Sequence, residues 1–379
     1  MKELLEAARA RRRQSVALIR RLVECESPTH DPRAVARFTR LVAREIGRMA
    51  NCRTLSGRGM GPHLRCTFPP PASGKQGQIL LLGHSDTVWP VGTLRRRPFR
   101  EADGRLWGPG VLDMKAGIAM AIEAVRLLAR LNRPVGRRVV LLLSSDEEIG
   151  SPTSRDLIER EARRSDAVLV LEPGTGLEGK LKTARKGVAV YTIRVLGQAA
   201  HAGVDFAAGA NAVVELARQI QRAAGFTRLA RGITVSPGVV RGGTRSNVVP
   251  EEAAVEVDVR VPRLKDAEDL DRRFRALNPY DERCRIEVTG GLNRPPMERS
   301  PGGLRLFRLA RELAREIGLE LEESSSGGGS DGNFTAALGV PTLDGLGAVG
   351  EGAHAENECV LVDRIAERIA VLAGLIQAI

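Results

Sequence analysis

The chain has 379 residues, enough for two domains, and its 42% of hydrophobic residues excludes an intrinsically disordered protein. The formal net charge is +12, but the arginines responsible are spread along the whole chain, and no aromatic stacking motif accompanies them. This pattern argues against a nucleic-acid-binding protein.

The first half of the chain alternates between helical and strand-like patterns. Apolar residues recur at helical spacing in residues 2–23, 33–49 and 115–131. Three other segments are short and almost continuously apolar, which is typical of strands buried on both faces of a parallel sheet. These segments are residues 78–82, 139–143 and 167–171. The alternation predicts an α/β domain built on a mostly parallel, mixed sheet.

From about residue 188 the pattern changes to one-sided alternation. In residues 253–260, valines alternate with charged residues, which is typical of an antiparallel strand with one covered face. The predicted order is strand, helix, strand, strand, helix, strand, at residues 188–196, 209–224, 233–240, 253–260, 265–277 and 284–289. This is the split βαβ order of a ferredoxin-like α+β domain.

Helical patterns resume at residues 302–318 and 363–378, with a short strand predicted at residues 341–343. We therefore predict that a small ferredoxin-like domain is inserted into a larger α/β domain. The expected boundaries are residues 1–186 and 293–379 for the two parts of the larger domain, and residues 187–292 for the insertion.

Cysteine usage and apolar runs bear on the compartment. The five cysteines form no CxxC pair, and their odd number is typical of reduced thiols rather than a disulfide framework. They are Cys25, Cys52, Cys66, Cys284 and Cys359. The N-terminal residues lack a signal-peptide core, and no apolar run reaches the roughly 20 residues that span a membrane. We expect a cytoplasmic protein without membrane association.

Histidines and carboxylates follow the predicted strands of the larger domain, except that Asp113 lies in a Gly-rich turn before a helix and His354 in a later loop of small residues. Because the carboxyl ends of such strands meet at one edge of the sheet, we expect these side chains to converge. They are His84, Asp86, Asp113, Asp146, Glu147, Glu148, Glu172 and His354. Like charges crowd together when a cation lies between them, and imidazole with carboxylate suits Zn²⁺, Mn²⁺ or Co²⁺. The carboxylates exceed the needs of one tetrahedral zinc, which favours two metals sharing a bridging carboxylate.

Taken singly, some of these residues have ordinary alternatives. A lone histidine at a strand end is usually structural, and acidic residues after a strand often stabilise the first turn of a helix. For Glu172 and His354 alone, such a structural role is the simpler interpretation. The metal hypothesis depends on the whole set.

Five sequence blocks resemble motifs of a known enzyme family. They occur in the order "GHSDTVWP", "GPGVLDMKAG", "SSDEEIGS", "GQAAHAG" and "GEGAHAENE". Together they are similar to the M20 family of di-zinc metallohydrolases, which includes glutamate carboxypeptidase, acetylornithine deacetylase and succinyl-diaminopimelate desuccinylase. The resemblance implies a zinc exopeptidase-like fold for the larger domain, and a dimerisation or lid role for the insertion.

The resemblance also implies two Zn²⁺ ions per subunit, with Co²⁺ or Mn²⁺ as substitutes. His84 and Glu172 would bind one ion, Glu148 and His354 would bind the other, and Asp113 would bridge both. The peptide bond after Asp113 would be cis.

Three further residues have catalytic roles in this interpretation. Glu147 would act as general base and pass its proton to the leaving amine. The carboxylate of Asp86 would hold the second ring nitrogen of His84. His201, in the inserted domain, would donate to the oxyanion, and in dimeric relatives the equivalent histidine reaches the partner's active site. A surface-loop histidine is the alternative for His201.

Four residues resemble substrate-binding positions of the family: Arg260, Asn247, Lys180 and Arg294. Arg260 and Asn247 would hold the α-carboxylate of the substrate, since the planar fork of arginine suits a carboxylate. Lys180 and Arg294 would hold a glutamate side chain. An ion pair between Arg260 and Glu256 or Asp258 is the alternative.

We therefore expect hydrolysis of the amide bond to a C-terminal glutamate-like residue, in a small acidic N-acyl amino acid or peptide. A homodimer through the inserted domain is expected, without nucleic acid or membrane partners. An N-acyl-amino-acid deacylase of the acetylornithine deacetylase type is an alternative, as is a non-catalytic binding protein. Trp89 fits a pocket lining or a structural role, and Arg95–Arg97 is left without a function beyond a solvated surface.

Overall fold

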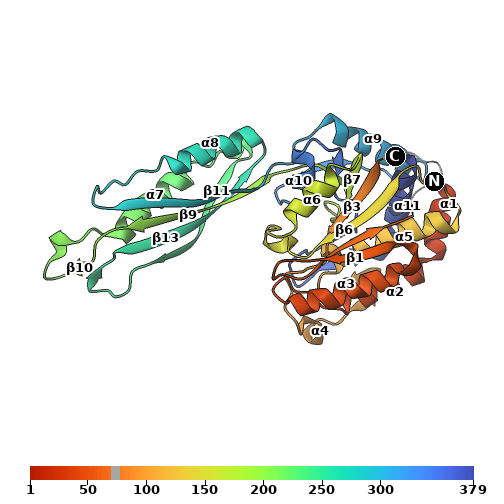
Figure 1. Cartoon of the computed structure of the whole chain (residues 1–379), viewed down its shortest axis with the longest axis horizontal. Coiled ribbons are helices and arrows are strands. Elements are labelled where there is room, and N and C mark those ends of the chain that lie inside the picture. Colours follow the sequence, from red (N-terminus) through yellow and green to blue (C-terminus); the bar gives the residue numbers. More distant parts are fainter. Residues whose placement is uncertain (70–76) are drawn as a thin grey trace. The chain divides into compact units, whose positions relative to one another are not determined.

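The structure is a computed structural model that describes residues 1–69 and 77–379 (Figure 1). The chain divides into two compact units. Unit 1 comprises Met1–Ala184, Arg299–Ser326 and Ser330–Ile379, and unit 2 comprises Arg185–Glu298 and Gly327–Gly329. The insertion was predicted at residues 187–292.

Unit 1 is built on a six-stranded mixed sheet. In sheet order, its strands are β1 (Asn51–Leu55), β2 (His63–Thr67), β6 (Arg138–Ser144), β3 (Gln78–His84), β7 (Ala167–Val170) and β16 (Thr342–Leu343). The last four are parallel, whereas β1 and β2 are antiparallel. Every residue of β3 is buried, as its continuous apolar sequence predicted. The α/β class and the mixed sheet are confirmed.

Helices cover both faces of this sheet (Figure 1). The helices of unit 1 are α1 (Lys2–Ala10), α2 (Arg12–Val23), α3 (Pro32–Ile46), α4 (Thr93–Arg96), α5 (Ala116–Arg130), α6 (Arg155–Ala162), α9 (Pro301–Arg315), α10 (Gly332–Ala337) and α11 (Val362–Ala378). Leu80 and Leu82 of β3 face a core shared with α6 and α10. Ile79 and Leu81 face the larger core that contains α5 and α11. Alternate side chains of β3 therefore pack into two separate cores, one on each face of the sheet.

The helix predicted at residues 2–23 is two helices. The backbone of Arg11, between α1 and α2, has φ −100° and ψ 10°. The Arg11 guanidinium pairs with the buried carboxylate of Glu123 on α5, with Nε and Oε2 2.8 Å apart. The local apolar period did not predict this break, because Glu123 lies 112 positions from Arg11 in the sequence.

Two smaller sheets complete unit 1. One contains β17 (Gly350–Glu351), β18 (Cys359–Leu361), β5 (Arg105–Trp107) and β4 (Arg100–Ala102). The other pairs β15 (Glu323–Ser326) with β8 (Leu181–Arg185). The loop between β17 and β18 carries His354. Among the described residues, no helix is long and apolar enough to cross a membrane.

Unit 2 has the predicted ferredoxin-like order. Its elements are β9 (Gly187–Leu196), α7 (Ala212–Ala224), β11 (Thr234–Gly242), β13 (Glu252–Val261), α8 (Leu264–Arg275) and β14 (Arg285–Arg294). The antiparallel sheet has the order β11-β13-β9-β14, and α7 and α8 cover one of its faces (Figure 1). A short pair, β10 (Ala200–His201) and β12 (Val248–Val249), extends from it. The one-sided valine pattern of β13 matches this single covered face.

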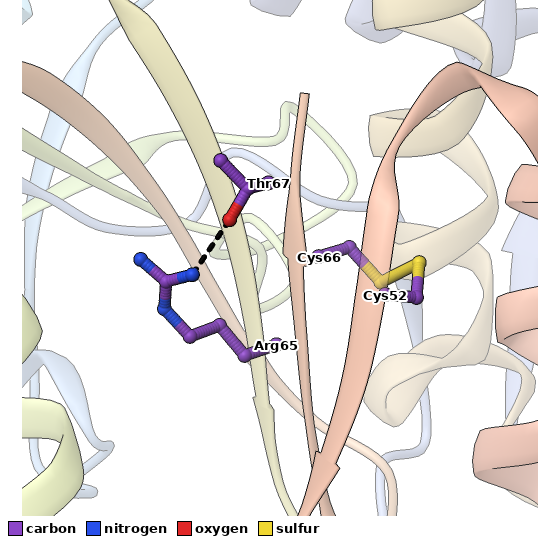
Figure 2. Close-up of a disulfide and its surroundings, with 4 residues drawn as sticks. All are labelled: Cys52, Arg65, Cys66 and Thr67. Atoms are coloured by element: carbon purple, nitrogen blue, oxygen red, sulfur yellow. Dashed lines mark hydrogen bonds between the residues drawn. A yellow bond between two sulfur atoms is a disulfide. The ribbon is translucent and has the colours of Figure 1, made fainter. Parts of the chain in front are cut away.

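One disulfide contradicts the expectation of reduced cysteines. Cys52 on β1 and Cys66 on β2 are directly opposite in the antiparallel pair, their Cα atoms are 4.0 Å apart, and their sulfurs are bonded (Figure 2). Strand register places them together, and spacing along the sequence does not reveal register. Cys25, Cys284 and Cys359 are free. A cytoplasmic location stays a prediction, and this bond weighs against it because disulfides are rare in the cytosol.

Candidate metal centre and active site

Three neighbouring parallel strands end at the same edge of the unit 1 sheet. In the β3–β6 ladder, His84 lies opposite Ser144, after which the chain turns into the 3-10 helix Glu147–Ile149. In the β3–β7 ladder, Leu82 lies opposite Val170, which is followed closely by Glu172. Adjacent parallel strands thus deliver their terminal side chains to one place, as expected for an α/β sheet.

The structure brings together all five predicted metal ligands. His84 Nε2 lies 3.0 Å from Asp113 Oδ1 and 3.4 Å from Glu172 Oε1. His354 Nε2 lies 3.2 Å from Asp113 Oδ2 and 3.2 Å from Glu148 Oε2. Asp113 therefore presents one oxygen to each group of ligands. Within each group, the candidate ligand atoms lie within 4.8 Å of one another.

These residues fit divalent metal ions. The donor atoms are imidazole nitrogens and carboxylate oxygens without sulfur, a set that suits zinc, manganese or cobalt. Glu148 Oε1 is buried and has no hydrogen-bond partner among the described residues. A buried carboxylate oxygen without a partner is costly unless a cation satisfies it. Two ions, with Asp113 shared between them, would account for all five side chains.

The pKa shifts of the ligands also indicate that positive charge stabilises the carboxylates of this cluster. Hydrogen bonds with Asp113 and Glu148 raise the pKa of His354 to about 10. Burial would raise the pKa of Asp113, but hydrogen bonds from His354 and His84 hold it well below its usual range. Burial raises the pKa of Glu148. The cluster carries excess negative charge that protons on the imidazoles partly neutralise, and metal ions would neutralise it more fully.

Asp86 has a different contact from the one expected. The Nδ1 atom of His84 lies 2.9 Å from the main-chain oxygen of Asp86, whereas the nearer carboxylate oxygen is 3.6 Å away. The Asp86 carboxylate instead accepts hydrogen bonds from the backbone N–H groups of Glu147 and Glu148, at 3.3 Å each, and from Thr29 Oγ1 at 2.9 Å. Asp86 thus orients the turn that carries Glu147, the expected general base. The side chain of Glu147 is half-buried in this turn.

Glu358 is a buried acidic residue that the sequence analysis missed. Its Oε1 accepts hydrogen bonds from the backbone N–H groups of Leu112 and Asp113, at 2.9 and 3.1 Å. Its Oε2 accepts from the Gly110 N–H and from Trp89 Nε1, both at 2.8 Å. The carboxylate therefore holds the turn before and at the bridging Asp113, whose peptide bond to the next residue is cis, as predicted. Its place in the block "GEGAHAENE" was the available signal.

Trp89 and Arg97 gain structural roles in the same region. The Arg97 guanidinium stacks over the Trp89 ring, 4.6 Å from its centroid. It also donates to the main-chain oxygens of Ala355 and Glu356 in the loop that carries His354. His354 itself has a positive φ of 63°, which non-glycine residues adopt only when their surroundings impose it. Arg97 contacts the two residues that follow His354, so this arginine is not simply solvated.

The predicted substrate-binding residues have other partners in the structure. Lys180, in unit 1, pairs with Glu322, with Nζ and Oε2 2.6 Å apart. Arg260, in unit 2, makes two 2.8 Å hydrogen bonds to Asp258, which is the alternative considered for it. Arg294 is buried in unit 2.

Two more predicted residues also belong to unit 2. Asn247 and His201 are exposed, and His201 Nδ1 accepts hydrogen bonds from the backbone N–H groups of Gly203 and Val204. The geometry of the unit 2 candidates relative to the metal centre stays a prediction.

Similar structures share this fold. An aminopeptidase of Bacillus cereus superposes with a TM-score of 0.80 at 23% identity, covering 97% of this chain and 98% of that one. An M20 family metallo-carboxypeptidase of Sulfolobus solfataricus gives a TM-score of 0.73 at 18% identity, covering 96% and 98% of the two chains. At such identities the likeness concerns the fold alone.

Sequence comparisons define the family. Carboxypeptidase G2 from Pseudomonas sp. (strain RS-16) is 30% identical, over 98% of this chain and 91% of the relative. A succinyl-diaminopimelate desuccinylase of Legionella pneumophila (strain Lens) is 28% identical, over 76% of this chain and 80% of the relative. The model of peptidase family M20/M25/M40 matches residues 80–378, which include every candidate ligand. The chain therefore belongs to peptidase family M20/M25/M40, whose members are metal-dependent hydrolases.

Proposed function

We propose that this protein hydrolyses the amide bond between an acyl group and a C-terminal glutamate or similar acidic amino acid. The observation that carries the proposal is the pair of ligand groups sharing Asp113, with Glu147 one residue before Glu148. The similarity to carboxypeptidase G2 over nearly the whole chain supports a carboxypeptidase activity.

The chemistry supplied by bound divalent ions is the acidification of water and the polarisation of the amide carbonyl. Glu147 accepts a proton from the attacking water and passes it to the amine nitrogen as the C–N bond breaks. The products are a carboxylate and a free amino acid. The Asp86 carboxylate fixes the backbone of this turn and so the origin of the Glu147 side chain.

The hydrogen bonds of His201 support its role as oxyanion donor. Because Nδ1 accepts from two backbone N–H groups, at 3.2 and 3.1 Å, we infer that the neutral ring carries its proton on Nε2. That nitrogen is then available to donate to a negatively charged oxygen. A homodimer through unit 2 is part of the proposal, and the exposed valines Val239 and Val240 on the edge strand β11 support such a contact.

Selection of an acidic leaving group would require exchange of ion-pair partners. Lys180 would leave Glu322, and Arg260 would leave Asp258, to bind substrate carboxylates. Arg294 and Asn247 would complete the carboxylate site. Exposed ion pairs contribute about 0–1 kcal/mol, so this exchange costs little.

An N-acyl-amino-acid deacylase without acidic selectivity is the second candidate. It is favoured by the pairing of Lys180 with Glu322 and by the desuccinylase relatives. It would use the same ligands and the same base.

A panel of N-acetyl amino acids with acidic, neutral and basic side chains separates the two, with zinc-loaded protein and kcat/KM as the measurement. We expect N-acetyl-glutamate to be cleaved fastest. Equal rates for alanine and glutamate derivatives would favour the deacylase, and absence of any cleavage would overturn both. Glu147→Gln should retain zinc and lose about 10²–10⁴-fold in kcat.

A further inference from the structure

A cavity of about 460 Å³ opens beside the candidate active site in unit 1. Glu148, one of the candidate ligands, forms part of its wall, so the cavity borders the metal centre. The remaining wall comes from the turn around Pro28, the segment after Asp86, and Ile149. A cavity of this size suits a small organic group.

The wall of the cavity exposes apolar side chains. Val88, Val91 and Ile149 line it, and their exposed fractions are 43%, 55% and 41%. Two prolines, Pro28 and Pro90, add further apolar surface. Apolar side chains that converge on a cavity next to a reactive centre are typical of a ligand site rather than of scattered surface residues.

Within the described part of the chain, the wall offers no lysine or arginine to a substrate carboxylate. The ionisable residues of the lining are His30, Asp31 and Glu148, and the described lining residues include no lysine or arginine. A glutamate product, with its two carboxylates, would find no guanidinium or ammonium group to bind there. The leaving amino acid must therefore bind elsewhere, which leaves the other side of the scissile amide for this cavity.

The cavity wall is fixed to the metal centre by hydrogen bonds. Pro28 and Thr87 form a parallel β-bridge, and the Thr87 N–H donates to the Ser27 main-chain oxygen at 2.9 Å. Thr29 Oγ1 donates to the carboxylate of Asp86, which also holds the Glu147 turn. The wall and the catalytic turn are thus parts of one connected framework.

We propose that this cavity binds the acyl group of the substrate and selects an apolar acyl group, aliphatic or aromatic. This inference rests on the proposed function and adds the substrate class on the acyl side. Val91 is the side chain chosen to test it, since it is the most exposed of the three and is not a candidate ligand.

The test is a series of N-acyl-L-glutamates with acetyl, butanoyl, hexanoyl, benzoyl and succinyl groups. For wild-type protein, kcat/KM should rise by about fourfold for each buried methylene, and the anionic succinyl group should be disfavoured. Val91→Asp should flatten this rise, because a buried acyl chain would then meet a charged side chain. Val91→Lys should instead raise kcat/KM for the succinyl substrate.

The matched control is Leu264→Asp, which places the same charge at a residue of unit 2 with 44% exposure. It should leave the acyl selectivity unchanged. Turnover of the acetyl substrate without any dependence on acyl length would overturn this inference and leave the proposed function intact. Absence of turnover with every substrate would instead overturn the proposed function. Thermal unfolding of each variant checks that it is folded.

Discussion

Substitution of Glu358 by glutamine tests whether this buried carboxylate positions the bridging ligand. Both oxygens of Glu358 accept two hydrogen bonds, and the side chain is fully buried. In the glutamine variant, an NH₂ group replaces one oxygen. Whichever oxygen is replaced, two donors lose their acceptor and face another donor.

The expected loss follows from this count of donors. A buried donor without an acceptor costs about 1–3 kcal/mol, so the two lost contacts should lower the free energy of unfolding by about 2–6 kcal/mol. Since two of the four donors are the backbone N–H groups of Leu112 and Asp113, the turn that carries the bridging carboxylate should also loosen. Loss of such outer contacts typically weakens metal affinity about 10–100-fold.

Zinc affinity, measured by competition with a chromophoric chelator, separates a positioning role from simple destabilisation. The matched control is Glu215→Gln in unit 2, because Glu215 is also buried and accepts from the backbone N–H groups of Tyr280 and Asp281. The control should lose stability and keep its zinc affinity. Wild-type zinc affinity in folded Glu358→Gln protein would refute the positioning role. Trp89→Phe, which removes one donor, should have a smaller effect of the same kind.

Three other measurements test separate parts of the structure. Because the pKa of His354 is raised to about 10 in the metal-free protein, its stabilising charge is lost as pH rises toward that value, so the Tm of EDTA-treated protein should fall between about pH 7 and 10. Zinc affinity should rise over the same range, since the metal must displace that proton, and His354→Gln should reduce both trends. Cys52→Ser should lower the free energy of unfolding by about 3 kcal/mol, as expected for a 14-residue separation, and reductant should then have no further effect on stability. His201→Ala should lower kcat about 10²–10³-fold while zinc affinity stays unchanged, and an unaltered kcat would contradict its assignment as oxyanion donor.

Local patterns were sufficient for the elements that frame the site. The continuous apolar runs became buried parallel strands, and parallel strands necessarily bring their terminal residues to one edge. This is why His84 and Glu172, far apart in sequence, could be placed together before the structure was known. The valine alternation of β13 likewise indicated a sheet with one covered face.

Contacts set by long-range packing were not accessible in this way. Glu358 reaches Asp113 across 245 residues, and no local period records such a contact. The pairing of Cys52 with Cys66 depends on strand register, which a one-residue shift would have broken. Asp86 was correctly predicted to lie near His84. Whether His84 Nδ1 contacts its main-chain oxygen or its carboxylate depends on backbone geometry, which the sequence does not reveal.

The division of Asp113 between two histidines makes the two halves of the centre thermodynamically linked. One carboxylate charge serves both sides, so whatever cation occupies one side reduces the field felt on the other. By reciprocity, each occupant must alter the affinity for its neighbour by the same factor. Binding of cations at the two positions should therefore not be independent. Loss of the Asp113 carboxylate should abolish this coupling and also weaken cation binding at both positions.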